Sequence, residues 1–129
     1  MDASAAIAVL LNLGTSALAI RERLEGSAEG PHVPHLFEME VLSALRRYAL
    51  GRGLSEVRGS ELLEDLASLR LNRYPHTALL RRMWELKENV TVQDAAYVAL
   101  AETLDAPLVT MDAGLARAPG IRAAVEVYR

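Results

Sequence analysis

Four acidic residues are placed so that they could do chemistry together: Asp2, Glu40, Asp94 and Asp112. Asp112 directly follows the apolar segment 108–111, and active sites of open parallel α/β sheets lie outside the carboxyl ends of the strands. Asp2 precedes an apolar helical segment, Asp94 falls in the first turn of a later helix, and Glu40 lies inside an apolar helical run. Carboxylates gathered at one point would repel one another and raise each other's pKa, so such a cluster would need a cation. Mg²⁺, with Mn²⁺ as the alternative, prefers carboxylate and water oxygens and serves phosphoryl chemistry.

Each of these residues also has a purely structural interpretation. The spacing from Thr91 to Asp94 is that of a helix capping box, in which the negative charge of the acid interacts favourably with the positive end of the helix dipole. Asp112 fits a turn before a glycine, Asp2 fits an N-terminal helix cap, and Glu40 fits a solvent-facing helix position. Taken one position at a time, the spacing leaves both interpretations open.

The composition describes a chain that folds as one globular domain. Its 129 residues suffice for one ordinary domain, and 51% hydrophobic with 24% charged residues excludes a disordered chain. The lack of cysteine excludes disulfides, thiolate zinc sites and catalytic thiols, and it favours a reducing cytoplasm. We expect neither a membrane span nor a signal peptide, because no apolar run is long enough and residues 1–4 carry no basic side chain. A formal net charge of −3 indicates that this protein would not bind nucleic acid through bulk positive charge.

The elements that must position the acids alternate along the chain. Apolar residues at helical spacing, together with caps such as Ser55 and Thr91, predict helices at about 5–11, 15–25, 35–52, 55–69, 76–88, 91–104 and 114–117. Short strands are predicted at 32–33, 69–72, 107–111 and 125–128. Helices separated by short strands indicate an α/β protein with a small parallel sheet that is covered on both faces.

Two parts of the sequence resemble the PIN domain family. The first is Asp2-Ala-Ser4 ahead of an apolar helix, followed by Glu40-Val-Leu-Ser-Ala-Leu-Arg46-Arg47. The second is Asn89-Val-Thr91-Val-Gln-Asp94-Ala-Ala-Tyr97-Val-Ala-Leu-Ala-Glu102, followed by Pro107-Leu-Val-Thr110-Met-Asp112. Together the motifs are similar to the toxin component of VapBC-type toxin–antitoxin pairs. They cover essentially the whole chain in the right order, so we expect residues 1–129 to form a single PIN domain.

The resemblance implies a three-layer α/β/α sandwich with a small central parallel sheet and a metal-dependent endoribonuclease activity. Asp2, Glu40, Asp94 and Asp112 match the acidic positions of the family and would hold Mg²⁺, which would activate a water to cut RNA. Ser4 and Thr110 match small hydroxyl positions beside the metal and would orient the carboxylates. A helix cap at Ser4 and an ordinary strand position at Thr110 remain the alternatives.

The resemblance also implies partners. A cognate VapB-type antitoxin would inhibit the enzyme, the substrate would be RNA, and the toxin would form a homodimer. Arg46 and Arg47, which lie one to two turns beyond Glu40, are candidates for RNA contact, as are Arg81, Arg82 and Lys87. A solvated helix face is the alternative for every one of these basic residues.

The sequence departs from the family pattern at two positions. Relatives usually carry three or four apolar residues before the first aspartate, whereas only Met1 precedes Asp2, so the first strand is expected to be truncated. Gln93 stands where relatives often have an aromatic residue, which affects packing or substrate contact rather than metal binding.

The sequence argues against two other classes of function and leaves two more open. A receiver-type signalling domain would need paired acids and a lysine near them, and a dehalogenase-type phosphatase would need aspartate where Ser4 stands. A PIN nuclease that processes RNA or DNA without an antitoxin, and a catalytically silent PIN-like binding module, stay open as alternatives.

Overall fold

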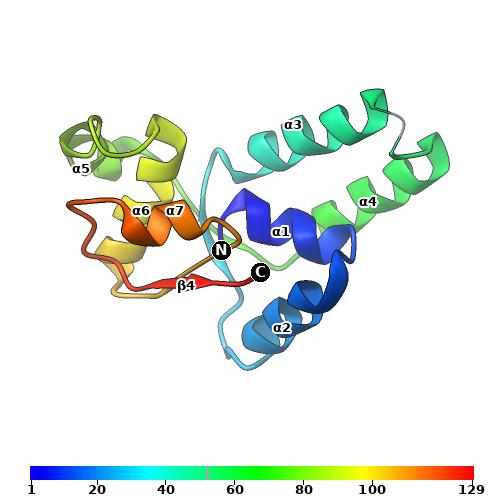
Figure 1. The fold of residues 1–129 in the computed structure, drawn as a ribbon, viewed down its shortest axis with the longest axis horizontal. Helices are drawn as coiled ribbons and strands as arrows, with labels where there is room; N and C mark the ends of the chain where they lie inside the picture. Colours follow the sequence, from blue (N-terminus) through cyan, green and yellow to red (C-terminus); the bar gives the residue numbers. More distant parts are fainter. Residues whose placement is uncertain (52) are drawn as a thin grey trace.

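The computed structural model describes residues 1–51 and 53–129, which form helices and short strands in alternation (Figure 1). In chain order the elements are α1 (Ala3–Leu10), α2 (Gly14–Glu25), β1 (His32–Pro34), α3 (Phe37–Leu50), α4 (Glu56–Ser68), β2 (Asn72–Tyr74), η1 (Thr77–Leu79), α5 (Leu80–Glu85), α6 (Val92–Leu104), β3 (Leu108–Thr110), α7 (Ala113–Arg117) and β4 (Val125–Val127). The predicted α/β class with parallel strands is confirmed.

In the described part of the chain the strands form two separate two-stranded parallel sheets, β1–β2 and β3–β4. His32 of β1 lies opposite Asn72 of β2, and Leu108 of β3 lies opposite Val125 of β4. Between the pairs runs the start of the chain, where the Asp2 backbone N–H donates to the Val109 carbonyl at 3.0 Å. Helix α1 begins directly after Asp2, so residues 1 and 2 form no strand.

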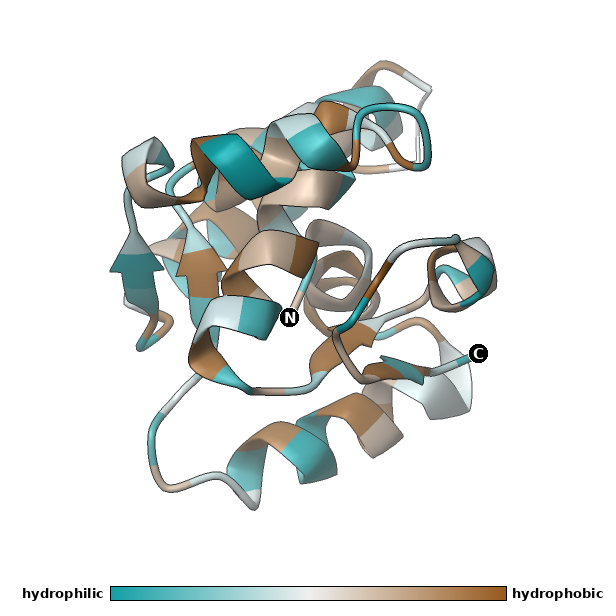
Figure 2. Cartoon of the chain, turned by 90° about the vertical axis from the view of Figure 1, so that its left-hand side faces the viewer, coloured by the Kyte–Doolittle hydropathy of each residue, from teal (hydrophilic) through white to brown (hydrophobic). Residues whose placement is uncertain are grey.

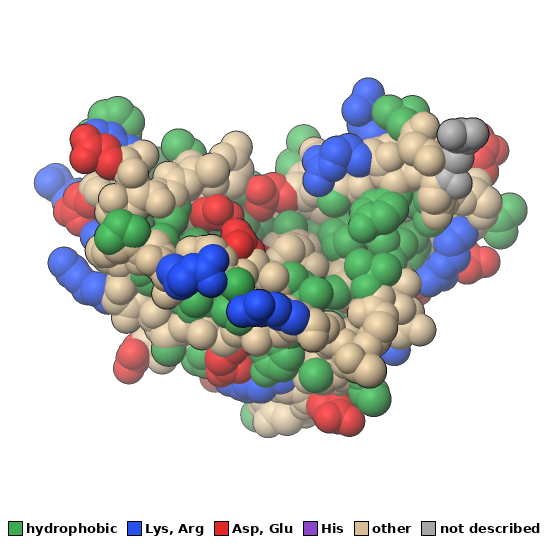
Figure 3. Space-filling model, viewed as in Figure 1, with side chains coloured by type: hydrophobic (Ala, Val, Ile, Leu, Met, Phe, Trp, Pro, Cys, Tyr) green, Lys and Arg blue, Asp and Glu red, His purple; other side chains and the backbone are tan. Residues whose placement is uncertain are grey.

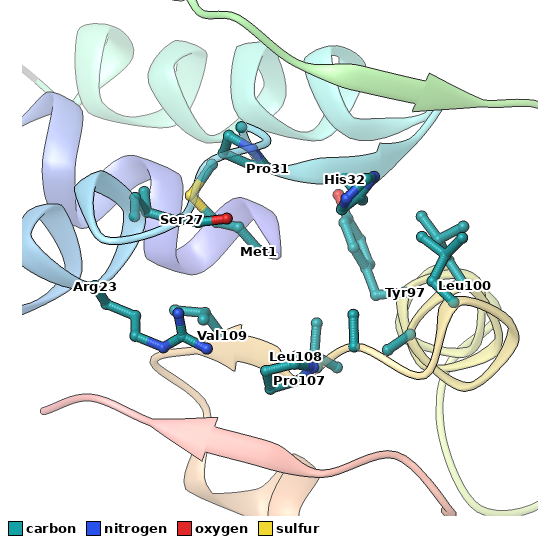
Figure 4. A pocket seen from close by; sticks show the side chains of 15 residues that line it. Met1, Arg23, Ser27, Pro31, His32, Tyr97, Leu100, Pro107, Leu108 and Val109 are labelled. Atoms are coloured by element: carbon teal, nitrogen blue, oxygen red, sulfur yellow. The ribbon is translucent and has the colours of Figure 1, made fainter.

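A cavity of about 110 Å³ separates the facing edges of β1 and β3. Figure 4 shows Pro31 and His32 on one side of it, Leu108 and Val109 on the other, and Met1 between them. Burial lowers the pKa of the Met1 amino group, with Asp2 and Glu126 acting in the opposite direction. Met1 thus lines the cavity between the two strand pairs, with its amino group buried.

The core is built around two apolar helices. In α1 the buried residues are Ala5, Ala6, Ile7, Ala8 and Leu10, and in α6 they form the continuous run Ala95–Ala101. Apolar segments accordingly gather in the middle of the molecule, while outer helix turns are hydrophilic (Figure 2). Helices that are apolar nearly all round are buried on most sides, which makes α1 and α6 a rigid base for the residues at their N-termini.

Several predicted boundaries differ from the structure. The strand predicted at 69–72 lies at Asn72–Tyr74, because its register is set by β1: the Asn72 N–H donates to the Pro31 carbonyl at 2.8 Å and the Tyr74 carbonyl accepts from His35 N–H at 2.9 Å. His35 is thereby engaged with β2, and α3 begins only at Phe37. The helix predicted at 76–88 is a 3₁₀ turn followed by the short α5, and Arg52, the predicted end of the third helix, lies outside the described residues.

No helix in the described ranges is by itself long and apolar enough to cross a membrane. Only α1 and α2 together have the length and composition, and they are bent by 110° relative to each other.

Candidate active site

Asp2 is the most firmly held of the four predicted carboxylates. Its side chain caps α1, because Oδ1 accepts from the Ala5 N–H at 3.1 Å, and the residue is only 6% exposed. The Ser4 hydroxyl donates to Oδ1 at 2.6 Å, and the Thr110 hydroxyl donates to Oδ2. Three donors from two elements therefore fix both oxygens of a buried carboxylate in one orientation.

The Ser4 and Thr110 hydroxyls join the start of α1 to the end of β3. Ser4 Oγ accepts from the Met111 N–H at 3.0 Å, and Thr110 Oγ1 accepts from the Asp112 N–H at 3.0 Å. The two hydroxyl oxygens lie 3.3 Å apart. The alternative in which Ser4 caps the helix is wrong, because Asp2 occupies that position, and Thr110 is tied to Asp2 as well as being a strand residue.

Asp112 and Asp94 both lie at helix starts, where each takes part in a capping hydrogen bond. Asp112 caps α7 through a hydrogen bond from the Gly114 N–H to Oδ1 at 2.8 Å, and Thr91 caps α6 by accepting from the Asp94 N–H at 3.1 Å. Asp112 is exposed, Asp94 is half-buried, and both line one open surface depression. A capping contact to one oxygen or to the backbone leaves carboxylate oxygens available for another ligand.

The four carboxylates lie within one another's electrostatic field. Burial raises the pKa of Glu40, and the charges of Asp94 and Asp2 raise it further, against an opposing effect of Tyr97. Burial likewise raises the pKa of Asp94; Thr91 opposes this, and the charges of Asp2 and Asp112 add to it. Acidic side chains gather in the central hollow of the molecular surface (Figure 3). Tertiary structure thus brings together the ends of four segments that are distant in sequence.

Tyr97 is a residue of this site that sequence reasoning did not single out. It follows Asp94 by about one turn of α6, is 3% exposed, and its buried hydroxyl has no hydrogen-bond partner in the described part of the chain. Burial, and then the neighbouring Glu40 carboxylate, raise the pKa of the phenol. The signal available in the sequence was the three-residue spacing from Asp94, which places both side chains on one helix face.

The donor types at this site fit a divalent cation. All four side chains offer hard carboxylate oxygens, and among residues 1–51 and 53–129 none of the four is paired with an arginine or lysine. In their present conformations no three His, Asp or Glu side chains of those ranges lie close enough to hold one ion. The pKa values of Glu40 and Asp94 are raised and neither carboxylate has a cationic partner, so the binding of a cation would be favoured here. Asp94 and Asp112, which line the open depression, would have to turn inward to share one ion.

The predicted RNA-contacting arginines lie apart from this depression. Arg46 and Arg47 are exposed on α3, and neither lines the surface next to Asp94 and Asp112. Arg82, also considered for RNA contact, instead binds both carboxylate oxygens of Glu102, at 2.7 and 3.1 Å.

Comparisons with known proteins place the whole chain among nucleases. The PIN domain family matches residues 1–121. Ribonuclease VapC1 of Mycobacterium tuberculosis is 42% identical over 130 residues, which cover 100% of this chain and 96% of the relative. Ribonuclease VapC9 of the same organism is 44% identical over 112 residues (87% and 84%), and Ribonuclease VapC12 is 37% identical over 127 residues (98% and 96%). The crystal structure of PAE2754 from Pyrobaculum aerophilum superposes with a TM-score of 0.64 at 27% identity, covering 98% of this chain and 81% of that one.

Proposed function

Since this chain belongs to the PIN domain family and to the VapC ribonucleases within it, we propose that it cuts RNA at the site formed by Asp2, Glu40, Asp94 and Asp112. The family and the class of enzyme predicted from the sequence are confirmed by these relatives. The observation that carries the assignment to the site is the buried, triply hydrogen-bonded Asp2 carboxylate, with Glu40 and Asp94 close enough for its charge to add to the effect of burial in raising their pKa values.

The cofactor we propose is Mg²⁺, with Mn²⁺ as the alternative. When bound, it would supply positive charge to the scissile phosphate and a water nucleophile at neutral pH. Asp2 would be the fixed ligand, because the Ser4 and Thr110 hydroxyls hold its oxygens in place. Asp94 and Asp112 line the open side of the site and would be the ligands that adjust to the ion. Glu40, whose pKa is raised by burial, would complete the set from α3.

The RNA product ends follow from this choice of nucleophile. Attack by water on phosphorus releases the 3′ oxygen and leaves a 5′-phosphate on the other fragment. No ribose 2′-hydroxyl and no histidine base is needed for this reaction.

The VapC relatives imply a VapB-type antitoxin as protein partner. We propose that the antitoxin inhibits this chain and that two copies of the chain form a homodimer. The four carboxylates form no ion pair with an arginine or lysine of the described residues, which suits a basic inhibitory segment electrostatically.

Incubation of the purified chain with total RNA in Mg²⁺, Mn²⁺ or EDTA, followed by mapping of the cut ends, tests the proposal. We expect cleavage with either metal and none in EDTA, and we expect Asp94→Asn and Asp112→Asn each to abolish it. The cation is tested separately by the melting temperature without RNA, which Mg²⁺ should raise for the unaltered chain and hardly at all for Asp94→Asn. Full cleavage by Asp94→Asn, or cleavage in EDTA, would refute the assignment.

A further inference from the structure

Trp84 and Lys87 form an exposed pair at the end of α5. Trp84 is the only tryptophan of the chain and is 67% exposed. The Lys87 ammonium lies 4.8 Å from the centroid of the indole ring, within the range of a cation–π interaction. The ring is otherwise exposed, so the face turned away from Lys87 offers a flat apolar surface that is open to water.

This pair borders the proposed active site. Lys87 lines the same open depression as Thr91, Asp94 and Asp112, and the segment 88–90 joins it directly to the cap of α6. Trp84 does not itself line this depression; it is linked to the depression through Lys87, whose ammonium lies 4.8 Å from the centroid of the indole ring.

Lys87 also differs from the neighbouring Arg82 in what it binds. Arg82 is held by Glu102 and by the Gly120 carbonyl, the latter at 2.6 Å. Within the described ranges Lys87 pairs with no carboxylate, and its charge is directed over the indole ring. An ammonium in this position can reach a phosphate that approaches together with a planar ring.

We propose that Trp84 stacks against an unpaired base of the RNA substrate while Lys87 contacts an adjacent phosphate, which makes the pair a substrate-binding site beside the scissile position. The proposal rests on the proposed function, because it takes RNA to be the substrate at the carboxylates. Bases in a duplex are already stacked on one another, so this site selects single-stranded segments. Stacking on an aromatic ring uses the flat face that all four bases share and therefore gives affinity with little sequence preference.

The single tryptophan allows a direct binding test. In the Asp94→Asn background, which prevents cleavage, a short oligouridylate is titrated into the protein while indole fluorescence is followed. We expect saturable quenching by the single strand and little by an RNA duplex of equal length. Labelled oligouridylate should bind Trp84→Ala about 5- to 150-fold more weakly, and Trp84→Phe should retain most of the affinity. Lys87→Gln should lower the slope of log K against log salt by about 0.7.

Leu50→Ala is the matched control, because Leu50 has the same 67% exposure and lies at the end of α3. It should bind like the unaltered chain. In cleavage assays with Asp94 intact, Trp84→Ala should raise KM and leave kcat nearly unchanged. Cleavage with an unchanged KM, or a change of oligomeric state in Trp84→Ala by sedimentation, would overturn the stacking site while leaving the nuclease assignment standing. Absence of cleavage in the unaltered chain would instead refute the proposed function.

Discussion

Replacement of Thr110 by valine tests whether the hydroxyl pair organises the site. The substitution keeps the shape of a side chain that is 0% exposed, but it removes the donor to Asp2 Oδ2 and the acceptor for the Asp112 N–H. A hydrogen bond to a charged group contributes about 1.5–3 kcal/mol, and a buried carboxylate that loses its donor carries the desolvation cost. We therefore expect Thr110→Val to lower the free energy of unfolding by about 2–3 kcal/mol, or the melting temperature by roughly 8–12 °C.

The activity should fall along with the stability. A carboxylate ligand that loses an orienting partner typically costs about 10- to 100-fold in metal affinity or rate, so RNA cleavage at limiting Mg²⁺ should drop by that factor. The assays are thermal melting by circular dichroism and cleavage of total RNA over a range of Mg²⁺ concentrations. Cleavage rates are measured well below the melting temperature of the variant, so that a loss of rate is not caused by unfolding.

Thr103→Val provides the matched control for this prediction. The Thr103 hydroxyl donates to the Ala99 carbonyl at 2.8 Å inside α6, and the residue is exposed. Its replacement should change stability by less than about 0.5 kcal/mol and leave cleavage unaltered. If Thr110→Val melted and cut RNA like Thr103→Val, the role assigned to the hydroxyl pair would be refuted.

Three further changes test the electrostatics and the packing. The pKa values of Glu40 and Asp94 are raised in the folded state, so the contribution of these carboxyl groups to stability is lost as pH rises through those pKa values. Glu40→Gln or Asp94→Asn should therefore raise the melting temperature in EDTA at neutral pH. This gain in melting temperature should disappear in acid, where both carboxyl groups are protonated. Arg82→Ala should lower stability by about 1–2 kcal/mol in urea unfolding with KM for RNA unchanged, because Arg82 is committed to Glu102; a selective rise in KM would contradict this. A short extension of alternating valine and isoleucine ahead of Met1 should enter the cavity between β1 and β3 and raise the melting temperature, whereas an equally long extension of glutamate should not.

Local rules allowed much of the chain to be predicted. Thr91 and Ser55 were expected to begin helices, and both accept the capping hydrogen bond, from Asp94 and Arg58 respectively. Capping depends on residues three apart, so the sequence carries the full information. Asp2, Asp94 and Asp112 were likewise identified from their positions at element ends, and all four acids from the resemblance of their motifs. They remain the residues proposed for the site.

Contacts between segments that are distant in the sequence could not be predicted from local sequence patterns. The strand predicted at 69–72 moved to Asn72–Tyr74 because β1 fixes its register, and the side-chain alternation of a short segment cannot supply that pairing. Arg82 was considered for RNA contact until the fold placed Glu102 and Gly120 against it. In each case the partner lies at least twenty residues away, where only the packed chain decides which groups meet.

The sequence by itself determined which chemistry is available: four carboxylates, two hydroxyls and no thiol. Only the tertiary structure decided which of those groups hydrogen-bond to one another and which are buried. Asp2, rather than Ser4, caps α1, and the Thr110 hydroxyl reaches it from the end of β3, 108 residues along the chain. It likewise decided that the buried Tyr97 hydroxyl lies next to Glu40 and that Trp84 stays exposed. Residue type sets what a side chain can donate or accept, whereas burial and neighbouring charges, which exist only in the folded chain, set its pKa and its partner.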